Sequence, residues 1–361
     1  MKSSPPSNIY RETRDAKKII VVHLGFLGDS LHLLPPLAEI KRHYPRAELH
    51  VLSSPLGCEI LRSAPCVDRA WAMDQDRATR TLRGQWAVIR ELRREKFDLA
   101  INFSGSDRTI ILTGLTGARV RVAAAAGRHH FWNRWLIAHW VPRLDANQTM
   151  FEQFRGVLAA CGFELEPARF DFKLDEQAVV WAGQNVPPGA IHVSVNSAKS
   201  LKEWPIEHYT ALLQKLWLRQ PDLPVVASSG YKVRERERLR ALVAGVNDPR
   251  LRVLPEDLNI AQLAGVLTHC RLHVGPDSGT MHLAVALGIP VVAYFREQGE
   301  FRAWLPRGAM NRVVSVPCGC VDHHSCPCER TGQAACLAGL QPETMADVIL
   351  QQLDRPPKIF P

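Results

Sequence analysis

A carboxylate stands near the end of the first apolar run at a spacing that suits acid–base chemistry. The segment His23-Leu-Gly-Phe-Leu-Gly-Asp-Ser30 overlaps the end of the run Lys18–Leu24, which the pattern predicts to be a buried strand. Gly25 and Gly28 permit a tight turn there, so that Asp29 stands where a helix begins. Asp29 can then serve as a general base or bind a substrate hydroxyl. The alternative is that it only caps the helix.

A second polar segment has the composition of an anion-binding helix start. The chain reads Val274-Gly-Pro-Asp-Ser-Gly-Thr-Met-His282 after an apolar run, and a helix is expected from about Gly279. Free N–H groups and the partial positive charge at a helix N-terminus favour a diphosphate. Structural capping by the polar residues is the competing explanation. The residues that we expect to bind the anion are Asp277, Ser278, Gly279, Thr280 and His282.

A third polar loop, Ser194–Pro205, follows another predicted strand. Its small hydrogen-bonding residues are Asn196 and Ser197, and its cations are Lys199 and Lys202. Ammonium groups in such a loop can neutralise the growing charge on a diphosphate leaving group. Solvated loop charge is the alternative for both lysines.

Five of the nine cysteines fall within 19 residues near the C-terminus. Clustered thiolates can bind zinc or iron, although the spacing here is C-x-C rather than C-x₂-C, and reduced or loop-stapling thiols remain the alternative. The candidate ligands of a structural metal are Cys318, Cys320, Cys326, Cys328 and Cys336.

The elements that position these residues alternate between apolar strands and amphipathic helices, the pattern of parallel α/β sheets. We predict two Rossmann-like, doubly wound domains, residues 1–184 and 185–361, because Pro187-Pro188-Gly189 precedes a second alternation. A further option is that the last helix packs back on the first domain. Ligands of paired α/β domains bind at the carboxyl ends of the strands, here expected to face a central cleft. The predicted strands are 18–24, 49–52, 97–103, 190–195, 223–228, 251–254, 271–275 and 290–295.

The formal charge of +9 has one source. The stretch Arg77–Arg143 holds 13 basic and 4 acidic residues, whereas the rest of the chain holds 32 of each sign. Such a patch favours an anionic partner: nucleic acid, a membrane surface or a phosphorylated substrate. The segment lacks a nucleic-acid recognition motif, so nucleic acid ranks last.

Targeting signals are not evident. The polar segment Met1–Lys18 lacks the apolar core of a secretory signal, and no stretch has about 18 uninterrupted apolar residues. The odd number of cysteines argues against a secreted disulfide framework. We therefore expect a cytoplasmic protein.

Taken together, the motifs resemble the ADP-heptose:lipopolysaccharide heptosyltransferase family. The resemblance rests on Leu27-Gly-Asp29, Lys202-Glu-Trp-Pro205 and Gly275-Pro-Asp-Ser-Gly-Thr-Met-His-Leu283, and on a Cys-rich tail ending at Glu343. It covers about Lys18 to Leu353. It implies a GT-B architecture, in which the first domain binds the acceptor and the second binds the donor.

The resemblance also implies roles for individual residues. Asp29 matches the general base of an inverting transfer from ADP-heptose to a phosphorylated lipid A–core acceptor, and Lys202 matches the lysine at the donor phosphates. No cofactor would be required for catalysis, and the enzyme would be peripheral on the inner membrane. Glu235 and Leu258 are the nearest equivalents of the acidic and adenine-pocket donor residues. The expected acceptor-binding residues are Gly28, Arg119, Arg121 and Arg128.

Three alternatives have distinct consequences. A heptosyltransferase acting on a bacterial surface protein would share these motifs, and a non-catalytic nucleotide-sugar-binding protein would bind the donor without turnover. A nicotinamide-dependent enzyme is disfavoured because no G-x-G-x-x-G follows the first strand.

Overall fold

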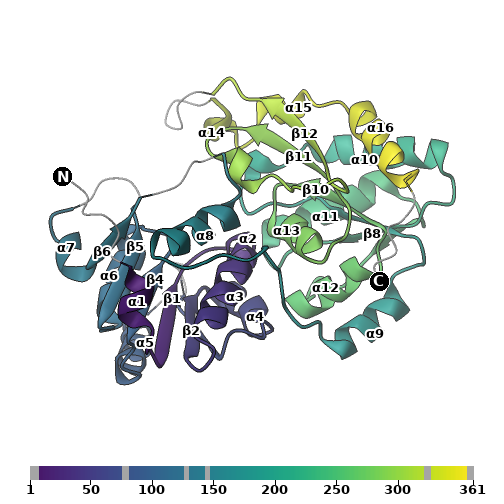
Figure 1. Ribbon diagram of the computed structural model, residues 1–361. Helices are drawn as coiled ribbons and strands as arrows, with labels where there is room; N and C mark the ends of the chain where they lie inside the picture. The colour runs from purple at the N-terminus through teal and green to yellow at the C-terminus, as the bar shows by residue number, and fades with distance from the viewer. Residues whose placement is uncertain (1–7, 75–80, 126–129, 143–146, 321–326, 356–361) are drawn as a thin grey trace. The chain divides into compact units, whose positions relative to one another are not determined.

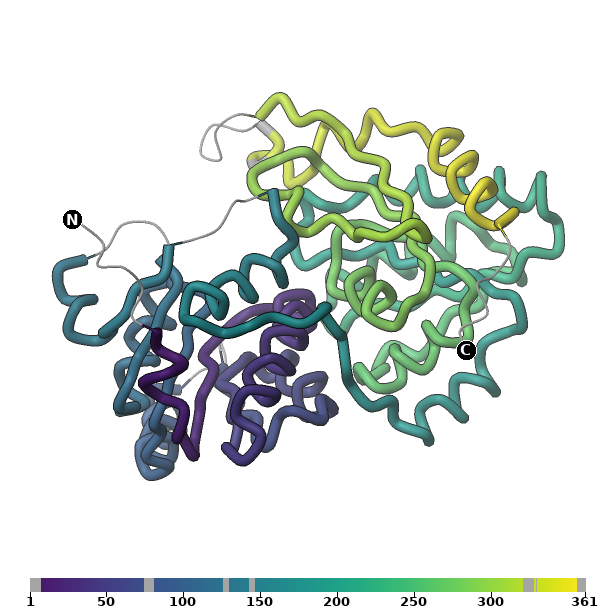
Figure 2. Tube along the Cα trace, in the orientation of Figure 1, coloured from purple at the N-terminus to yellow at the C-terminus, as the bar shows by residue number. Residues whose placement is uncertain are grey.

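The computed structural model describes residues 8–74, 81–125, 130–142, 147–320 and 327–355. The chain divides into two compact units, Met1–Lys173 and Leu174–Pro361. Each contains a six-stranded parallel sheet. Helices flank both sheets in Figure 1, and Figure 2 traces the chain in the same orientation. The predicted α/β class and the two Rossmann-like halves are confirmed.

The first unit has the strand order β3-β2-β1-β4-β5-β6. Its central strand β1 is apolar on both faces, and Ile19 to Val22 are fully buried. Burial on both faces is the reason this segment reads as a continuous apolar run rather than an alternating one. The elements of this unit are α1 (Ile9–Thr13), β1 (Lys18–Val22), α2 (Leu27–His32), α3 (Leu34–His43), β2 (Glu48–Ser53), α4 (Pro55–Leu61), β3 (Arg69–Ala72), α5 (Leu82–Arg94), β4 (Leu99–Asn102), α6 (Asp107–Leu115), β5 (Val120–Ala124), α7 (Asn133–Leu136), β6 (His139–Val141) and α8 (Met150–Ala160).

The second unit has the order β12-β11-β10-β7-β8-β9. Its main core packs β7, β8 and β10 against α10 and α16, with Trp204 and Tyr209 fully buried among them. The elements are α9 (Glu176–Asn185), β7 (Ile191–Ser194), the 3₁₀ turn η1 (Ser200–Lys202), α10 (Ile206–Arg219), β8 (Val225–Ser228), α11 (Val233–Val246), β9 (Leu251–Val253), α12 (Ile260–Thr268), β10 (Leu272–Pro276), α13 (Gly279–Ala286), β11 (Val291–Glu297), η2 (Phe301–Trp304), β12 (Arg312–Pro317), α14 (Pro327–Thr331), α15 (Ala335–Ala338) and α16 (Pro342–Leu353).

The domain boundary falls eleven residues earlier than the predicted division between 184 and 185. The cause is α9, which packs against α12 of the second unit. Ala182 and Val186 belong to a core cluster with Val226 and Val266, and a Cβ at Gly265 would meet the backbone of α9. The helix therefore completes the second unit.

The last helix also differs from its expected place. Met345 and Ile349 of α16 are fully buried in the core of the second unit, against α10. The helix thus belongs with its own unit rather than with the first. None of the helices in the described ranges has the length and apolar character to span a membrane.

Candidate functional site

Asp29 lies in the first turn of α2, just beyond the carboxyl end of the central strand β1. Its Oδ2 atom accepts a hydrogen bond from the backbone N–H of Phe26 at 2.8 Å. The carboxylate therefore does cap the helix, as the structural alternative held. The side chain nevertheless remains 24% exposed, so its second oxygen can still meet a ligand.

His23, the residue that follows β1, is the nearest titratable neighbour of Asp29. Its Nε2 atom lies 3.7 Å from Oδ1 of Asp29, and Phe154 packs edge-on against the ring. Among the described residues, neither ring nitrogen has a hydrogen-bond partner. Burial acts to raise the pKa of Asp29, but His23, the N–H of Phe26 and His32 outweigh it and lower that pKa below its usual value. Asp29 is thus held as a carboxylate.

The loop between β1 and α2 is fixed by close contacts. A Cβ at Gly25 would lie 2.3 Å from the Cβ of Asp29, so only glycine lets the carboxylate occupy this position. The hydroxyl of Ser54 donates to the carbonyl of Gly25 at 2.6 Å. Ser54 comes directly after β2, the neighbour of β1. Neither His23 nor Ser54 is among the predicted site residues. The sequence could have indicated them, because each is a polar residue that directly follows an apolar strand.

Of the predicted acceptor-binding residues, Gly28 adjoins Asp29, whereas Arg119 and Arg121 lie elsewhere in the sheet. Gly28 is buried within α2. Arg119 and Arg121 lie at the amino end of β5, level with the start of β4 and hence at the sheet edge opposite Asp29. The guanidinium of Arg121 donates to the carbonyls of Ala118 and Leu136, both at 2.6 Å, which is a structural role. Arg128 lies outside the described residues.

A different basic surface lies along α5. A concavity of about 920 Å³ is lined by this helix, with the arginines at 83, 90, 93 and 94 beside Trp86. Leu82 is 78% exposed and Trp86 is 60% exposed. Because α5 connects the carboxyl end of β3 to the amino end of β4, its N-terminal turn lies at the same edge of the sheet as Asp29. This helix holds four arginines and one glutamate, so its net charge of +3 is a third of the formal charge of +9.

In the second unit the predicted donor residues converge on Asp277. The ammonium of Lys202 forms an ion pair with Oδ2 of Asp277, and Nε2 of His282 lies 3.8 Å from Oδ1. The hydroxyl of Ser197 donates to the backbone carbonyl of Asp277 at 2.8 Å. Burial acts to raise the pKa of Asp277, yet His282 and Lys202 more than offset it and lower that pKa.

This cluster surrounds the N-terminus of α13. Ser278 is the N-cap residue and accepts from the N–H of Met281 at 3.3 Å. Gly279 and Thr280 form the first turn and are half-exposed. Because the first N–H groups of a helix have no partner within it, this turn presents donors and positive potential beside the ammonium of Lys202. The arrangement suits a diphosphate.

Buried ion pairs hold the loop that carries Lys202. The carboxylate of Glu203 accepts from the N–H of Ser197 at 2.9 Å and pairs with Arg234 and Arg238. The next residue, Trp204, is fully buried and donates through Nε1 to the carbonyl of Leu340 at 3.0 Å. Glu203 and Arg234 are not among the predicted site residues. They are 31 positions apart, and no local sequence pattern indicates that they form an ion pair.

The remaining donor residues differ in their positions. The amide of Asn196 donates to the backbone carbonyl of Glu235 at 3.1 Å, which joins Glu235 to the edge of the cluster. The carboxylate of Glu235, however, caps α11 at the N–H of Lys232. Leu258 packs against a separate core cluster that contains Leu254. Among the described residues, Asn196 borders the Lys202 cluster only through its chain neighbour Ser197.

Four of the five candidate metal-binding cysteines lie in described segments, and Sγ of Cys320 is 3.9 Å from Sγ of Cys328. Among the described residues, however, no three of these thiols lie within 4.8 Å of one another. Cys326 falls outside the described residues.

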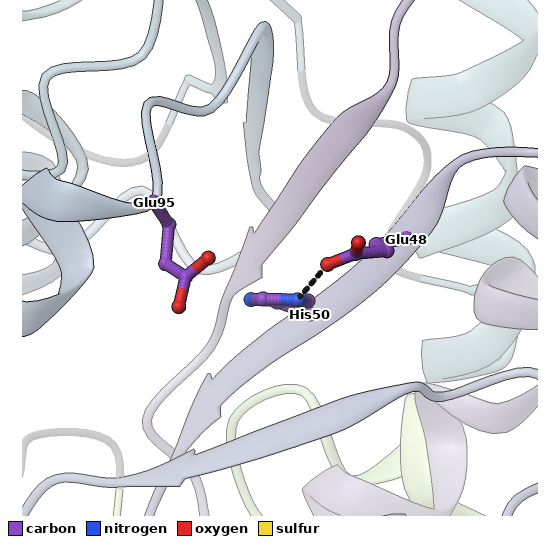
Figure 3. Close-up of side chains that lie close together, drawn as sticks. All are labelled: Glu48, His50 and Glu95. Atoms are coloured by element: carbon purple, nitrogen blue, oxygen red, sulfur yellow. Dashed lines mark hydrogen bonds and ion pairs between the residues drawn. The ribbon is translucent and has the colours of Figure 1, made fainter.

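A second cluster of potential metal ligands lies at the amino edge of the first sheet. Figure 3 shows His50 between Glu48 and Glu95, whose ligand atoms lie within 4.8 Å of one another. The ammonium of Lys18 is 2.6 Å from Glu95 and 3.4 Å from Glu48, and therefore already supplies a cation to these carboxylates. The indole of Trp71 donates to Nδ1 of His50 at 3.2 Å, which leaves Nε2 to donate to Glu48. We interpret this cluster as an ion-pair network.

Comparison with known proteins identifies the family of this chain. The model of glycosyltransferase family 9 (heptosyltransferase) matches residues 85–330, more than half of the chain. Lipopolysaccharide core heptosyltransferase OpsX of Haemophilus influenzae is 24% identical over 310 residues, covering 84% of this chain and 86% of that protein.

Two solved structures share the fold. The family 9 glycosyl transferase of Veillonella parvula has a TM-score of 0.77 at 20% identity, covering 93% of this chain and 97% of its own. The ADP-heptose lipopolysaccharide heptosyltransferase II of Escherichia coli has a TM-score of 0.72 at 19% identity, covering 93% and 98%. Both have the GT-B fold expected from the sequence. The chain belongs to glycosyltransferase family 9, the heptosyltransferases, and is an enzyme of that class.

Proposed function

We propose that this enzyme transfers heptose from ADP-heptose to a phosphorylated inner-core sugar of lipopolysaccharide, with inversion at the anomeric carbon. The observation that carries the proposal is the group formed by Lys202, Asp277 and Ser197 at the N-terminus of α13. An ammonium beside a helix N-terminus matches the charge of a diphosphate leaving group. The names of two relatives, OpsX and heptosyltransferase II, give the substrate class.

In this mechanism Asp29 takes the proton from an acceptor hydroxyl as its oxygen attacks the anomeric carbon. The bond from that carbon to the ADP oxygen breaks on the opposite face, so the configuration inverts. Asp29 is suited to this role because its lowered pKa keeps it ionised near neutral pH. General-base catalysis of this kind contributes about 10² to 10⁴-fold.

The leaving group gains negative charge on the diphosphate as the bond breaks. Lys202, the hydroxyl of Ser278 and the first N–H groups of α13 would stabilise this charge. Their positions are set before the substrate arrives, because Glu203 and Trp204 hold the loop. Such preorganised electrostatic stabilisation can equal or exceed the contribution of the base.

We infer in addition that the enzyme contacts the membrane surface that carries its acceptor. The support is α5, where exposed Leu82 and Trp86 accompany a row of arginines. Apolar and aromatic side chains among basic ones are typical of helices at anionic lipid interfaces.

The deciding experiment incubates the enzyme with ADP-heptose and three acceptors: lipid A carrying Kdo, the same lipid with a first heptose, and a bacterial surface protein. A mass increase of one heptose on a lipid acceptor is the expected result. Modification of the surface protein but of neither lipid would instead identify a heptosyltransferase that acts on a bacterial surface protein. Tight ADP-heptose binding without any product would indicate a non-catalytic sugar-nucleotide-binding protein.

A further inference from the structure

The loop that follows β7, residues 195–205, is held from both sides at the carboxyl edge of the second sheet. In that sheet β7 lies between β10 and β8. On the β10 side, the hydroxyl of Ser197 donates to the backbone carbonyl of Asp277 at 2.8 Å. On the β8 side, Nη2 of Arg234, in the first turn of α11, donates to the backbone carbonyl of Ser197 at 2.8 Å. A single residue, Ser197, therefore links Arg234 to the group around Asp277.

The charges near this loop are divided unevenly between two ion-paired groups. The ammonium of Lys202 pairs with the carboxylate of Asp277, so these two side chains together carry no net charge. In the other group, the carboxylate of Glu203 pairs with both Arg234 and Arg238, which leaves one positive charge in excess. A diphosphate is an anion, and it is attracted most strongly by charge that the protein has not already neutralised. The excess positive charge near the loop is therefore carried by the arginines.

The two arginines differ in what they contact. Arg238 donates to the backbone carbonyl of Trp204 at 2.8 Å, and its side chain is 23% exposed. The side chain of Arg234 is 39% exposed and donates to Glu203 and to the carbonyl of Ser197. A guanidinium has more N–H donors than these bonds use, and its forked geometry favours phosphate oxygens. Arg238 thus supports the backbone, whereas Arg234 has the exposure and the donors to bind an anion.

Glu203 fixes the orientation of Arg234. Its carboxylate is almost fully buried, and one oxygen accepts from the backbone N–H of Ser197 at 2.9 Å. The other oxygen accepts from Nη1 of Arg234. The same carboxylate therefore holds both the loop and the guanidinium. A cationic side chain that is oriented before its ligand arrives loses less conformational freedom on binding.

We propose that Arg234 is a second cationic residue for the diphosphate of the donor, and that it supplies the net positive charge that the pair of Lys202 and Asp277 lacks. This role rests on the proposed function, in which a nucleoside diphosphate sugar is the donor. Arg234 contacts a phosphate oxygen while its ion pair with Glu203 persists. Because the contact is to the phosphates and not to the nucleoside, Arg234 should matter for ADP and not for adenosine.

The test compares ADP with adenosine, which lacks the phosphates, by calorimetry on the full-length enzyme. Arg234→Gln should raise the Kd for ADP by about 10 to 100-fold and change that for adenosine by less than about twofold. Arg234→Lys keeps a charge opposite Glu203 but loses the fork, so its Kd for ADP should lie between those of the wild type and Arg234→Gln. Arg240→Gln removes an exposed arginine of the same helix that pairs with Glu256, and should change neither Kd.

The same measurements can exclude Arg234 from the donor site. A Kd for ADP in Arg234→Gln equal to that in Arg240→Gln would do so. Equal weakening of ADP and adenosine would do so as well, because Arg234 would then only position the loop. If the wild-type enzyme binds ADP and transfers heptose, either result leaves the proposed function intact. If the wild-type enzyme binds neither ADP nor ADP-heptose, the proposed function fails, and the role of Arg234 fails with it.

Discussion

The imidazole of His23 and the carboxylate of Asp29 face each other across 3.7 Å at the carboxyl end of the central strand β1. This separation exceeds a normal hydrogen bond, yet it is short enough for the charge of one group to act on the other. His23, at the buried end of β1, therefore acts electrostatically on Asp29, the residue that we propose as the base.

The first prediction concerns Asp29 itself. Asp29→Asn keeps the size of the side chain but removes the proton acceptor, so kcat should fall by about 10² to 10⁴-fold. The Kd for ADP should change by less than about twofold, since Asp29 belongs to the first unit and the predicted donor residues to the second. Steady-state kinetics and calorimetry check both values. Asp107→Asn, an exposed residue of the same unit, is the matched control. Turnover close to that of the control would remove Asp29 from the mechanism.

The second prediction is a pH effect of His23. The interaction with His23 lowers the pKa of Asp29. His23→Gln removes this interaction and should raise the pKa of Asp29. Because transfer requires ionised Asp29, the acidic limb of kcat/KM should move to higher pH. His43→Gln, a histidine of α3, should leave the limb in place. If His23→Gln lowers stability but leaves the acidic limb of kcat/KM at the same pH, His23 has a purely structural role.

The third prediction concerns Lys202. Lys202→Ala should weaken ADP binding by about 10 to 100-fold, because a charge-assisted contact contributes roughly 1.5–3 kcal/mol. It also leaves Asp277 without its ion-pair partner. Lys199→Ala removes a fully exposed charge from the same loop and should change the Kd by less than about threefold. Equal effects of the two substitutions would indicate a general loop charge rather than a specific phosphate contact.

The fourth prediction separates two basic surfaces of the first unit. Arg90→Glu and Trp86→Ala in α5 should weaken binding to vesicles containing phosphatidylglycerol by about tenfold, and added salt should reduce the wild-type affinity. Arg119→Glu reverses an exposed charge at the amino edge of the sheet and is the control. Co-sedimentation with anionic and neutral vesicles measures the difference. Equal loss in Arg90→Glu and Arg119→Glu, with no loss in Trp86→Ala, would indicate that only net charge matters.

The fifth prediction is a pH dependence of stability in the second unit. His192 and His273 are fully buried and share a hydrogen bond of 2.9 Å between their Nδ1 atoms. Burial lowers the pKa of His192 to about 4 and that of His273 well below its usual value. The unfolded chain binds protons near pH 6.5 whereas the folded chain does not, so stability is lost as the pH falls below about 6.5.

Each of these histidines contributes a slope of about 1.4 kcal/mol per pH unit within that window. The double variant His192→Leu/His273→Leu should flatten the dependence of the unfolding free energy on pH between 6.5 and 5, measured by urea denaturation. His208→Gln, a half-buried histidine of α10, should not. An unchanged slope in the double variant would contradict the assignment, whatever its absolute stability.

Eight of the twelve strands and the two-unit architecture follow from the sequence because buried parallel strands are continuous apolar runs. No such run marks β3, β5, β6 or β12. Three of these strands lie at sheet edges. The fourth, β5, contains Arg121, whose guanidinium donates hydrogen bonds to backbone carbonyls. A polar residue within a short strand hides the apolar pattern.

The site was predictable where chemistry is local and not where it depends on tertiary contact. The motif around Asp277 identifies its own helix start, and the structure places Lys202 in an ion pair with Asp277. Arg119 lies far from Asp29 because it stands at the amino end of β5. The sequence could not predict this position, since β5 itself was not predicted as a strand. Similarly, Pro187-Pro188-Gly189 signals a break, but only packing against α12 shows that α9 belongs after the boundary.

The two sheets share one connectivity, since renumbering β7–β12 as 1–6 reproduces the order of the first sheet. The reversal of strand order, where ligands of such sheets bind, therefore falls beside β1 in one unit and beside β7 in the other. Each unit closes its own core and carries its own share of the chemistry. Under the proposed function, mutations that alter acceptor choice can thus accumulate in one half while the nucleotide site in the other stays intact. This separation allows a lineage to diversify its surface sugars while keeping a common activated donor.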